Sequence, residues 1–385
     1  MSRGDKKLEH IRLERYLAKH FHFQLNEITG SIEFKKQYET VWEELNEFNI
    51  YRQLKLEGFT INLNELIYLL KSDYVNRFNP FVNYFESLPV WKNDPDYIRQ
   101  LCSFVQVKHP ARFEKHFKKW LVRTIRCALE DSYCNKHALI LVHEMQNSGK
   151  TTFIRFLCPE ALKNYMTENI SFDKDSLIAL VENFIINLDE LATFTRVEIN
   201  ALKSIMSKSF VKERHPFERK AKKLPRRVSF IGSTNMTEFL SDPTGNVRWI
   251  PFEISGIDWN YSSQVNIDEV WAQAYSLYKS GYSGDITAEE VRENEEENKQ
   301  FTLVSPEMEL LLKYYEPGTR EKHDLFLTTG EIEIALRKET DGLAKISANQ
   351  LGKALRMTGF SRDNRYSKGK EYPIKAYFLK FREEK

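Results

Sequence analysis

The chain has 385 residues, of which 41% are apolar and 29% are charged, and its formal net charge is +2. This composition is ordinary for a soluble protein, and the length predicts two or three domains with a substantial core. No apolar run reaches the roughly 18 residues of a membrane-spanning helix, which excludes a membrane span. A net charge so close to zero says little about partners, so the distribution of charge along the chain is more informative.

The cysteines do not form the pattern of a metal site. No two of them make a CxxC pair, and no histidine lies at zinc-ligand spacing around them. The first ten residues, MSRGDKKLEH, lead into no apolar stretch, so we expect no signal peptide. These features predict a cytoplasmic protein with free, buried thiols at Cys102, Cys127, Cys134 and Cys158.

Residues 1–92 are predicted to form a helical N-terminal region. Residues 8–22 are charged and amphipathic, and residues 62–70 have helical spacing, with Asn62 or Asn64 as the cap. A proline at position 80 interrupts the pattern, which resumes over residues 82–88. Another helix is expected to start at Asp94, with this residue as its N-cap.

Residues 93–285 show the strand, loop and helix order of a P-loop nucleotide-binding core. Apolar residues recur every three or four positions over residues 113–129, which predicts a long helix. The apolar runs 138–142, 184–188 and 227–232 predict three buried strands, and helical patterns separate them. We therefore expect an α/β fold in which flanking helices cover a parallel sheet.

Residues 286–385 are expected to form a linker helix and a winged-helix domain. The acidic run at residues 289–299 is typical of a solvated helix. Beyond it, one helix opens at Thr329, and Ser347 caps a second helix over residues 348–357 that Gly359 closes. A basic hairpin tip at residues 365–372 and a return strand at residues 374–381 complete the order of a winged helix-turn-helix.

One segment nearly fits the phosphate-binding pattern GxxxxGK[ST]. Gly149 lets the backbone curl so that amide groups face the phosphates, Lys150 should reach the β- and γ-phosphates, and the Thr151 hydroxyl should ligate Mg²⁺. Glu144 stands where the pattern has its first glycine and adds negative charge there. The alternative is a chance GKT in a turn, which the flanking strand and helix disfavour. The predicted ATP-binding residues are Gln146, Asn147, Ser148, Gly149, Lys150, Thr151 and Thr152.

Further residues are candidates for hydrolysis. Asp189 and Glu190 end an apolar strand 39 residues after Lys150, which fits a Walker B pattern. In that pattern Asp189 holds Mg²⁺ through water and Glu190 polarises the attacking water. Asn235 either orients the attacking water or senses the γ-phosphate, and the alternative is that it only forms a turn. Arg248 is either an arginine finger supplied across a subunit interface or a surface residue in a turn.

Positive charge is concentrated between residues 203 and 227, where there are ten Lys or Arg against two Glu. Contact with a nucleic-acid backbone in the channel of a ring is one interpretation, and a solvated helix and loop is the other. The block comprises Lys203, Lys208, Lys212, Arg214, Arg219, Lys220, Lys222, Lys223, Arg226 and Arg227, of which the six from Lys212 to Lys223 are the predicted DNA-binding residues.

A second basic cluster falls on the predicted recognition helix and wing. DNA binding is favoured there over docking of a protein. The cluster comprises Arg356, Arg362, Arg365, Lys368, Lys370 and Lys375.

Several stretches, taken in order, resemble one known family. They are NP at 79–80, LPVW at 88–91, KWLV at 119–122, GKTTF at 149–153, LDEL at 188–191, FIGSTN at 230–235 and FLSDPTGN at 239–246. Over residues 78–254, a little under half of the chain, the sequence resembles the virulence-associated E (VapE) family. These are P-loop ATPases of phages and mobile elements, similar to superfamily 3 and primase-associated helicases.

The resemblance implies an AAA+-like core in which Lys150 and Thr151 bind nucleotide and Asn235 is a sensor. It likewise assigns Mg²⁺ and hydrolysis to Asp189 and Glu190, and the arginine finger to Arg248. Where the family tends to carry two successive arginines, this chain has Val247 and then Arg248. Some members carry a primase domain, but the N-terminal region here shows no convincing cluster of metal-binding carboxylates. We expect no primer synthesis by this chain, and a separate primase stays open as a partner.

The first hypothesis is an ATP-dependent DNA helicase or translocase that replicates a mobile element. It would use ATP and Mg²⁺, bind single-stranded or duplex DNA, and assemble into a ring, which we expect to be a hexamer. The alternative is an ATP-gated DNA-binding initiator, regulator or defence switch without unwinding activity. A scaffold with a decayed ATP site is a third reading, against which the intact Lys150, Thr151, Asp189 and Glu190 argue.

Overall fold

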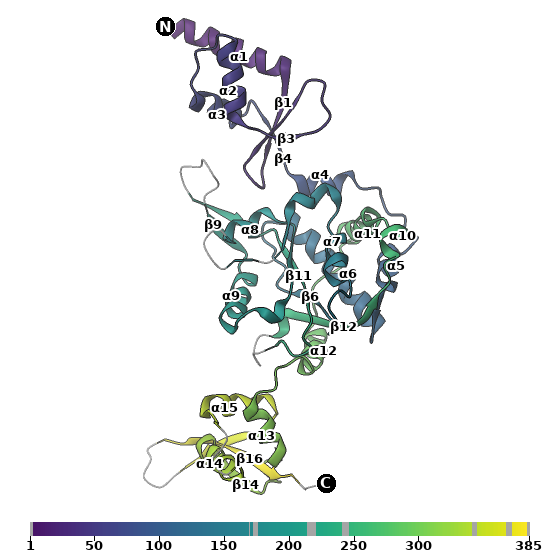
Figure 1. The fold of residues 1–385 in the computed structure, drawn as a ribbon, viewed down its shortest axis with the longest axis vertical. Helices are drawn as coiled ribbons and strands as arrows, with labels where there is room; N and C mark the ends of the chain where they lie inside the picture. Colours follow the sequence, from purple (N-terminus) through teal and green to yellow (C-terminus); the bar gives the residue numbers. More distant parts are fainter. Residues whose placement is uncertain are drawn as a thin grey trace. The chain divides into compact units, whose positions relative to one another are not determined.

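The chain divides into two compact units (Figure 1). The first comprises Met1–Asn235 and Arg248–Glu290, and the second comprises Met236–Val247 and Val291–Lys385. The computed structural model describes residues 3–168, 170–171, 176–213, 221–240, 246–340, 345–366 and 372–382.

A six-stranded sheet organises the first unit, with strand order β5-β12-β6-β11-β8-β7. All pairs are parallel except that of β5 with β12. The expected parallel sheet is thus confirmed, and β6, β11 and β8 correspond to the three expected strands, whereas β5, β7 and β12 were not predicted. The strands are β5 (Val105–Val107), β6 (Ala138–Val142), β7 (Met166–Glu168), β8 (Ile185–Leu188), β11 (Ser229–Thr234) and β12 (Trp249–Ile257).

The register of this sheet gathers three strand ends at one edge. Thr234 at the end of β11 pairs with Val142 at the end of β6, and Gly232 of β11 pairs with Leu188 at the end of β8. In parallel strands the carboxyl ends share an edge. The segments that follow β6, β8 and β11 therefore start next to one another.

Helices pack around the sheet through large apolar side chains. The Trp120 indole of α6 is buried and donates to the Phe230 carbonyl of β11 over 2.9 Å, and buried Trp271 of α11 donates to the Leu157 carbonyl over 2.9 Å. The expected long helix is confirmed as α6. The helices are α4 (Pro80–Ser87), α5 (Tyr97–Ser103), α6 (Pro110–Leu129), α7 (Lys150–Phe156), α8 (Ser176–Glu182), α9 (Arg196–Met206), α10 (Tyr261–Gln264) and α11 (Ile267–Lys279).

The prediction of a wholly helical N-terminal region is wrong, because these residues also contain a four-stranded sheet of order β3-β2-β1-β4. Phe21, Phe23 and Leu25 alternate with polar residues, and this period of two is the pattern of a strand. The strands are β1 (Phe21–Asn26), β2 (Ile32–Lys36), β3 (Glu43–Glu44) and β4 (Asn76–Phe78), and the helices are α1 (Arg3–His20), α2 (Glu47–Leu56) and α3 (Leu63–Leu70).

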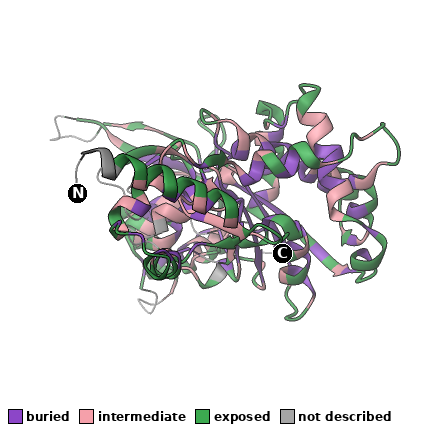
Figure 2. Ribbon diagram, turned by 90° about the horizontal axis from the view of Figure 1, so that it is seen from above, coloured by how far each residue is buried: buried purple, intermediate pink, exposed green. Residues whose placement is uncertain are grey.

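The helices of this region pack onto a core of their own. Most of the described surface of α1 is exposed, as Figure 2 shows, but Leu13 and Leu17 on one side are fully buried in that core. Of the two predicted caps, Asn62 and Asn64, it is Asn62 that caps α3, in a capping box with Glu65.

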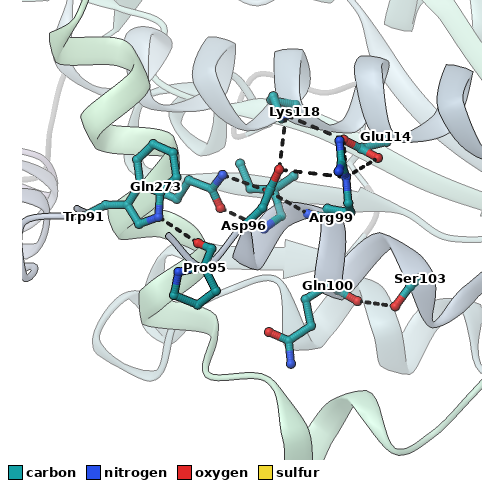
Figure 3. A network of polar contacts seen from close by, with 10 residues as sticks. Trp91, Pro95, Asp96, Arg99, Gln100, Ser103, Glu114, Lys118 and Gln273 are labelled. Atoms are coloured by element: carbon teal, nitrogen blue, oxygen red, sulfur yellow. Dashed lines mark hydrogen bonds and ion pairs between the residues drawn. The ribbon is translucent and has the colours of Figure 1, made fainter. Parts of the chain in front are cut away.

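The cap of α5 is Asp96 and not the predicted Asp94 (Figure 3). The Asp96 carboxylate accepts the Arg99 backbone N–H over 3.0 Å and the Gln273 amide of α11 over 2.8 Å. Lys118 of α6 lies 3.8 Å from the same carboxylate. The cap was misplaced because the helix begins two residues after Pro95, not directly at it. One aspartate thus joins three helices of the first unit.

The second unit combines helices with a small antiparallel sheet in which β13, β14 and β15 each pair with β16. Thr328 is the N-cap of α14, and its side chain accepts the Glu331 backbone N–H. The helix α15 spans the residues predicted for it. The return strand expected at residues 374–381 is β16. The elements are α13 (Pro306–Tyr314), α14 (Thr329–Glu339), α15 (Ala348–Met357), β13 (Tyr315–Pro317), β14 (Leu325–Thr328), β15 (Arg362–Arg365) and β16 (Ile374–Phe381).

The acidic helix α12 (Ala288–Lys299) is less solvated than predicted. Glu290, Asn294 and Asn298 recur every four residues and are buried along one side. The prediction of a solvated helix relied on the acidic composition, which does not show that one polar side of the helix is buried.

All four cysteines are buried and free, as predicted. Within the described ranges, none of the helices has the length and apolar character needed to cross a bilayer.

Candidate functional site

The loop between β6 and α7 has an unusual backbone. Asn147 and Gly149 adopt φ values of 57° and 85°, in the left-handed region that glycine occupies without strain. Gly149 is also buried, so a side chain at this position would meet both a backbone and a packing penalty. These features are those expected of a loop whose amides are directed at a ligand.

Lys150 is the first residue of α7, and its amine is bound by groups of this loop. Its side chain is buried, and Nζ donates to Asn235 Oδ1 over 2.7 Å and to Ser148 Oγ over 2.9 Å. It also donates to the carbonyls of His143 and Met145 over 3.1 and 3.2 Å. Burial lowers the pKa of Lys150, and the charge of Asp189 opposes this change. All four acceptors of the Lys150 amine are uncharged oxygens. The oxygens of a bound anion would compete with them for this amine.

Asp189, at the end of β8, accepts two hydroxyl groups. Thr151 Oγ1 donates to its Oδ1 over 2.9 Å, and Ser233 Oγ donates to the same oxygen over 2.6 Å. A carboxylate beside a hydroxyl is a hard oxygen pair that fits Mg²⁺. Among the described residues no group of three or more His, Cys, Asp and Glu could hold a metal. A Mg²⁺ here would therefore complete its shell with water and phosphate oxygens, as it commonly does.

Glu190 follows directly and is exposed. Its φ of 50° is uncommon for a residue with a side chain, and such conformations concentrate at active sites. Its carbonyl accepts the Thr193 N–H over 2.8 Å and the Thr193 hydroxyl over 2.9 Å. These bonds close a turn in which the Glu190 side chain stays exposed.

These residues surround one cleft of about 410 Å³ at the carboxyl edge of the sheet. It brings together the seven predicted ATP-binding residues with the predicted Asp189, Glu190 and Asn235. The described lining residues are Gln146, Asn147, Ser148, Gly149, Lys150, Thr151, Thr152, Arg155, Asp189, Glu190, Ser233, Thr234, Asn235 and Trp259.

Arg248 lies at the other edge of the same sheet. It immediately precedes Trp249, which pairs with Ala138 at the amino end of β6, about 13 Å along the strand from the loop. Its Nη2 donates to Ser207 Oγ over 3.0 Å, and its Nε is buried without a hydrogen-bond partner among the described residues. The structure therefore does not bring Arg248 into the cleft of its own chain.

Part of the basic block forms a hairpin of β9 (Phe210–Glu213) and β10 (Lys222–Pro225). Lys212 pairs with Lys223 across the two strands, and Lys223 Nζ lies 4.0 Å from the centre of the Phe210 ring. Lys212, Lys222 and Lys223 are exposed. The predicted DNA-binding residues Arg214, Arg219 and Lys220 lie outside the described residues.

Arg226 and Arg227 do not belong to this surface. Arg226 is fully buried and donates to the Asn135 carbonyl, and Arg227 donates to the Ala128 carbonyl over 2.9 Å and pairs with Asp131. Lys203 is buried as well. Sequence spacing grouped these residues with exposed lysines because it does not report burial.

In the second unit, Arg356 on α15 and Arg362 on β15 are exposed. Arg365 is instead half-buried, and its Nη1 pairs with Glu331 over 2.7 Å and donates to the Phe326 carbonyl over 3.1 Å. Lys368 and Lys370 lie outside the described residues.

Sequence reasoning missed several residues of the cleft. Ser233 is a polar residue near the end of a buried strand, and this pattern could have identified it as a residue of the site. Arg155 is held by Glu168, with Nη2 2.9 Å from Oε2. Trp259 comes from the loop after β12, a strand that was not predicted, so no motif pointed to it.

A family model described as the virulence-associated protein E-like domain matches residues 85–303, which is more than half of the chain. The chain belongs to this family. The matched segment includes every residue of the cleft, so the VapE-like domain contains the whole candidate site.

Solved structures that superpose on this chain include the apo C-terminal region of NrS-1, at 13% identity and a TM-score of 0.49. That match covers 95% of this chain and 98% of the other. Another is SCCmec type IV Cch, described as an active helicase, at 11% identity and a TM-score of 0.38, covering 94% and 92%. No curated protein matches the chain. At these identities, the function of this VapE-like chain has to be argued from its own residues.

Proposed function

We propose that this VapE-like chain is an ATPase that drives a DNA helicase or translocase of a mobile element. The observation that carries the proposal is the meeting of Lys150, Thr151, Asp189 and Asn235 through direct hydrogen bonds in one cleft. A basic loop residue, a hydroxyl, an acidic strand end and a polar sensor are the parts that nucleoside triphosphate hydrolysis requires.

Each residue has a separate task in this proposal. Lys150 exchanges its carbonyl acceptors for phosphate oxygens, and the Gly149 loop supplies amide donors. Thr151 and Asp189 hold Mg²⁺, which would supply positive charge beside the phosphates. Glu190 accepts a proton from the attacking water, and Asn235 orients that water through its amide.

The position of Arg248 supports an oligomer. A group at the amino edge of the sheet cannot serve the cleft of its own chain, but it can face the cleft of a neighbouring copy. We propose that the neighbour's Arg248 completes each site in a ring, as a hexamer, and stabilises the charge on the transferred phosphoryl group.

We assign DNA contact to the exposed lysines of the β9–β10 hairpin and to the second unit. There, α14 and α15 followed by the β15–β16 hairpin have the order of a winged helix, with Arg356 and Arg362 exposed. The strand order of the large sheet, with β6 between β12 and β11, supports an AAA+-like core. In this proposal residues 1–92 form an N-terminal region, 93–285 the ATPase core and 286–385 the linker and winged helix. A separate primase would supply primers.

The alternative function is an ATP-gated DNA-binding initiator, regulator or defence switch that does not unwind DNA. The hydrogen bond of Arg248 to Ser207 favours it, because an arginine engaged within its own chain cannot reach a neighbouring site until that bond breaks.

Strand displacement on a forked DNA with ATP and Mg²⁺ separates the two functions. The proposal expects unwinding by wild type and by the control Lys92→Ala, which removes an exposed lysine far from the cleft in sequence, and none by Lys150→Ala. ATP-dependent DNA binding without displacement would instead establish the switch.

A further inference from the structure

The cleft contains one side chain that the proposed hydrolysis does not use. Trp259 lies two residues after β12, and 53% of its surface is exposed. Its ring approaches the phosphate-binding loop so closely that a Cβ at position 149 would lie 2.9 Å from its Cζ2 atom. The ring therefore stands directly against Gly149, on the wall of the cleft.

This exposure distinguishes Trp259 from the tryptophans that build the core. Trp120, Trp249 and Trp271 are each no more than 1% exposed. A large aromatic side chain contributes its hydrophobic stabilisation only when something covers it. A ligand that covers the exposed part of the Trp259 ring would therefore gain hydrophobic stabilisation.

The segment that carries Trp259 is firmly held. The Asp258 N–H donates to the Phe104 carbonyl over 2.8 Å, and the Ser262 hydroxyl donates to the Trp259 carbonyl over 3.0 Å. Tyr261 is buried, and its ring meets those of Phe153 and Phe156 of α7 edge-on at 5.2 and 4.9 Å. The helix that follows the phosphate-binding loop thus fixes the backbone on which the indole stands.

The chemistry of the cleft shows what the ring is suited to cover. Every other described lining residue is polar, charged or glycine, so Trp259 offers the aromatic face of this wall. The polar groups match phosphates, Mg²⁺ and water. The Arg155 guanidinium, a group that also stacks on bases, is paired with Glu168. Bases stack on exposed tryptophan rings, and stacking discriminates by the size of the ring system.

We propose that Trp259 stacks on the base of the bound nucleotide and makes the cleft selective for purine nucleoside triphosphates. The inference rests on the proposed function, because it requires the triphosphate to bind at Lys150. Trp259 is a specificity residue in this account and has no part in hydrolysis.

Calorimetric binding of ATP, CTP and inorganic tripolyphosphate, each with Mg²⁺, tests the proposal on the full chain. Trp259→Ala should weaken ATP about tenfold, leave tripolyphosphate within about twofold, and reduce the preference for ATP over CTP. Trp259→Phe should retain most of the ATP affinity. The control Trp42→Ala, which removes a half-buried tryptophan of the N-terminal sheet region, should change none of the three.

The ratio of ATP to tripolyphosphate affinity decides the outcome. If Trp259→Ala weakens both ligands equally, the ring only supports the loop, and the stacking proposal is wrong. If ATP binding is unchanged, the base lies elsewhere and the proposal is also wrong. If wild type binds neither ligand, the proposed ATPase function itself fails, which is a distinguishable result.

Discussion

Lys150 and Asn235 are 85 residues apart in sequence, yet Nζ of the lysine donates to Oδ1 of the asparagine over 2.7 Å. The pair joins the loop after β6 to the end of β11. A phosphate that draws Lys150 away from this acceptor changes the hydrogen bonding of Asn235 in the same step. This coupling is the basis of the sensing role that we propose for Asn235.

Replacement of Asn235 by Ala should therefore affect turnover more than binding. We expect kcat to fall by about a hundredfold, because a positioned polar donor is lost, while the affinity for ATP changes little. Steady-state ATP hydrolysis gives kcat and KM, and calorimetric titration gives the affinity for ATP. Asn49→Ala, in an exposed position on α2, is the matched control. A rise in KM at constant kcat would contradict the sensing role.

The Ser233 hydroxyl should tune the Mg²⁺ site through Asp189. Its 2.6 Å bond orients Oδ1, the same oxygen that accepts Thr151, so Ser233→Ala should raise the Mg²⁺ concentration at half-maximal activity about tenfold. Titration of ATP hydrolysis with Mg²⁺ measures this shift. Ser87→Ala, at an exposed serine of α4 outside the cleft lining, is the control. An unchanged Mg²⁺ requirement would show that Ser233 does not act through the metal.

Arg248 is predicted to act between chains. Arg248→Ala and Lys150→Ala should each be inactive alone, but a mixture of the two should recover part of the ATP hydrolysis. In the mixture, a subunit with an intact cleft can receive Arg248 from a neighbour whose own cleft is disabled. Activity as a function of the mixing ratio tests this. If the mixture is no more active than either variant alone, the assignment of Arg248 to the neighbouring site is wrong.

The ion pair between Lys119 and Glu290 should make the first unit sensitive to acid. Burial raises the pKa of Glu290, but hydrogen bonds from Lys119, Thr287 and Lys115 outweigh it and lower this pKa to about 2. Since the folded-state pKa lies below the ordinary carboxyl value of 4.5, the stabilisation is complete above about pH 5 and is lost as the pH falls toward 2.

Glu290→Gln should accordingly lower the free energy of unfolding by about 3 kcal/mol at neutral pH, because it leaves Lys119 buried without its charged partner. The difference from wild type should shrink below about pH 4. Chemical unfolding at several pH values measures it, with the exposed Glu289→Gln as the control. A difference that does not depend on pH would exclude the charge of Glu290 as its source.

Much of the candidate site could be predicted from the sequence because its signals are local. The run Ala138–Val142, the GKT that follows and the Asp189–Glu190 pair each combine a buried strand with a polar end, and the parallel sheet then brings the ends together. The N-cap positions of Asn62 and Ser347 were found for the same reason, although only the Asn62 side chain makes a capping hydrogen bond.

Other features depended on contacts that spacing does not report. Trp259 enters the cleft only because β12 pairs with β6. Arg226 is buried against the Asn135 carbonyl and Arg227 donates to the Ala128 carbonyl of α6, and both contacts join residues more than 90 positions apart. The strands that begin at Phe21 and Ile32 were missed because the charged helix before them suggested that helical structure continued. Short alternating segments are weak signals until they find a partner strand.

ATP hydrolysis by wild type and Lys150→Ala, with and without single-stranded DNA, tests the central claim most directly. The account predicts turnover by wild type that DNA increases, and none by the variant beyond background. Equal turnover of the two proteins under both conditions would contradict it, since Lys150 would then not serve a nucleotide at all.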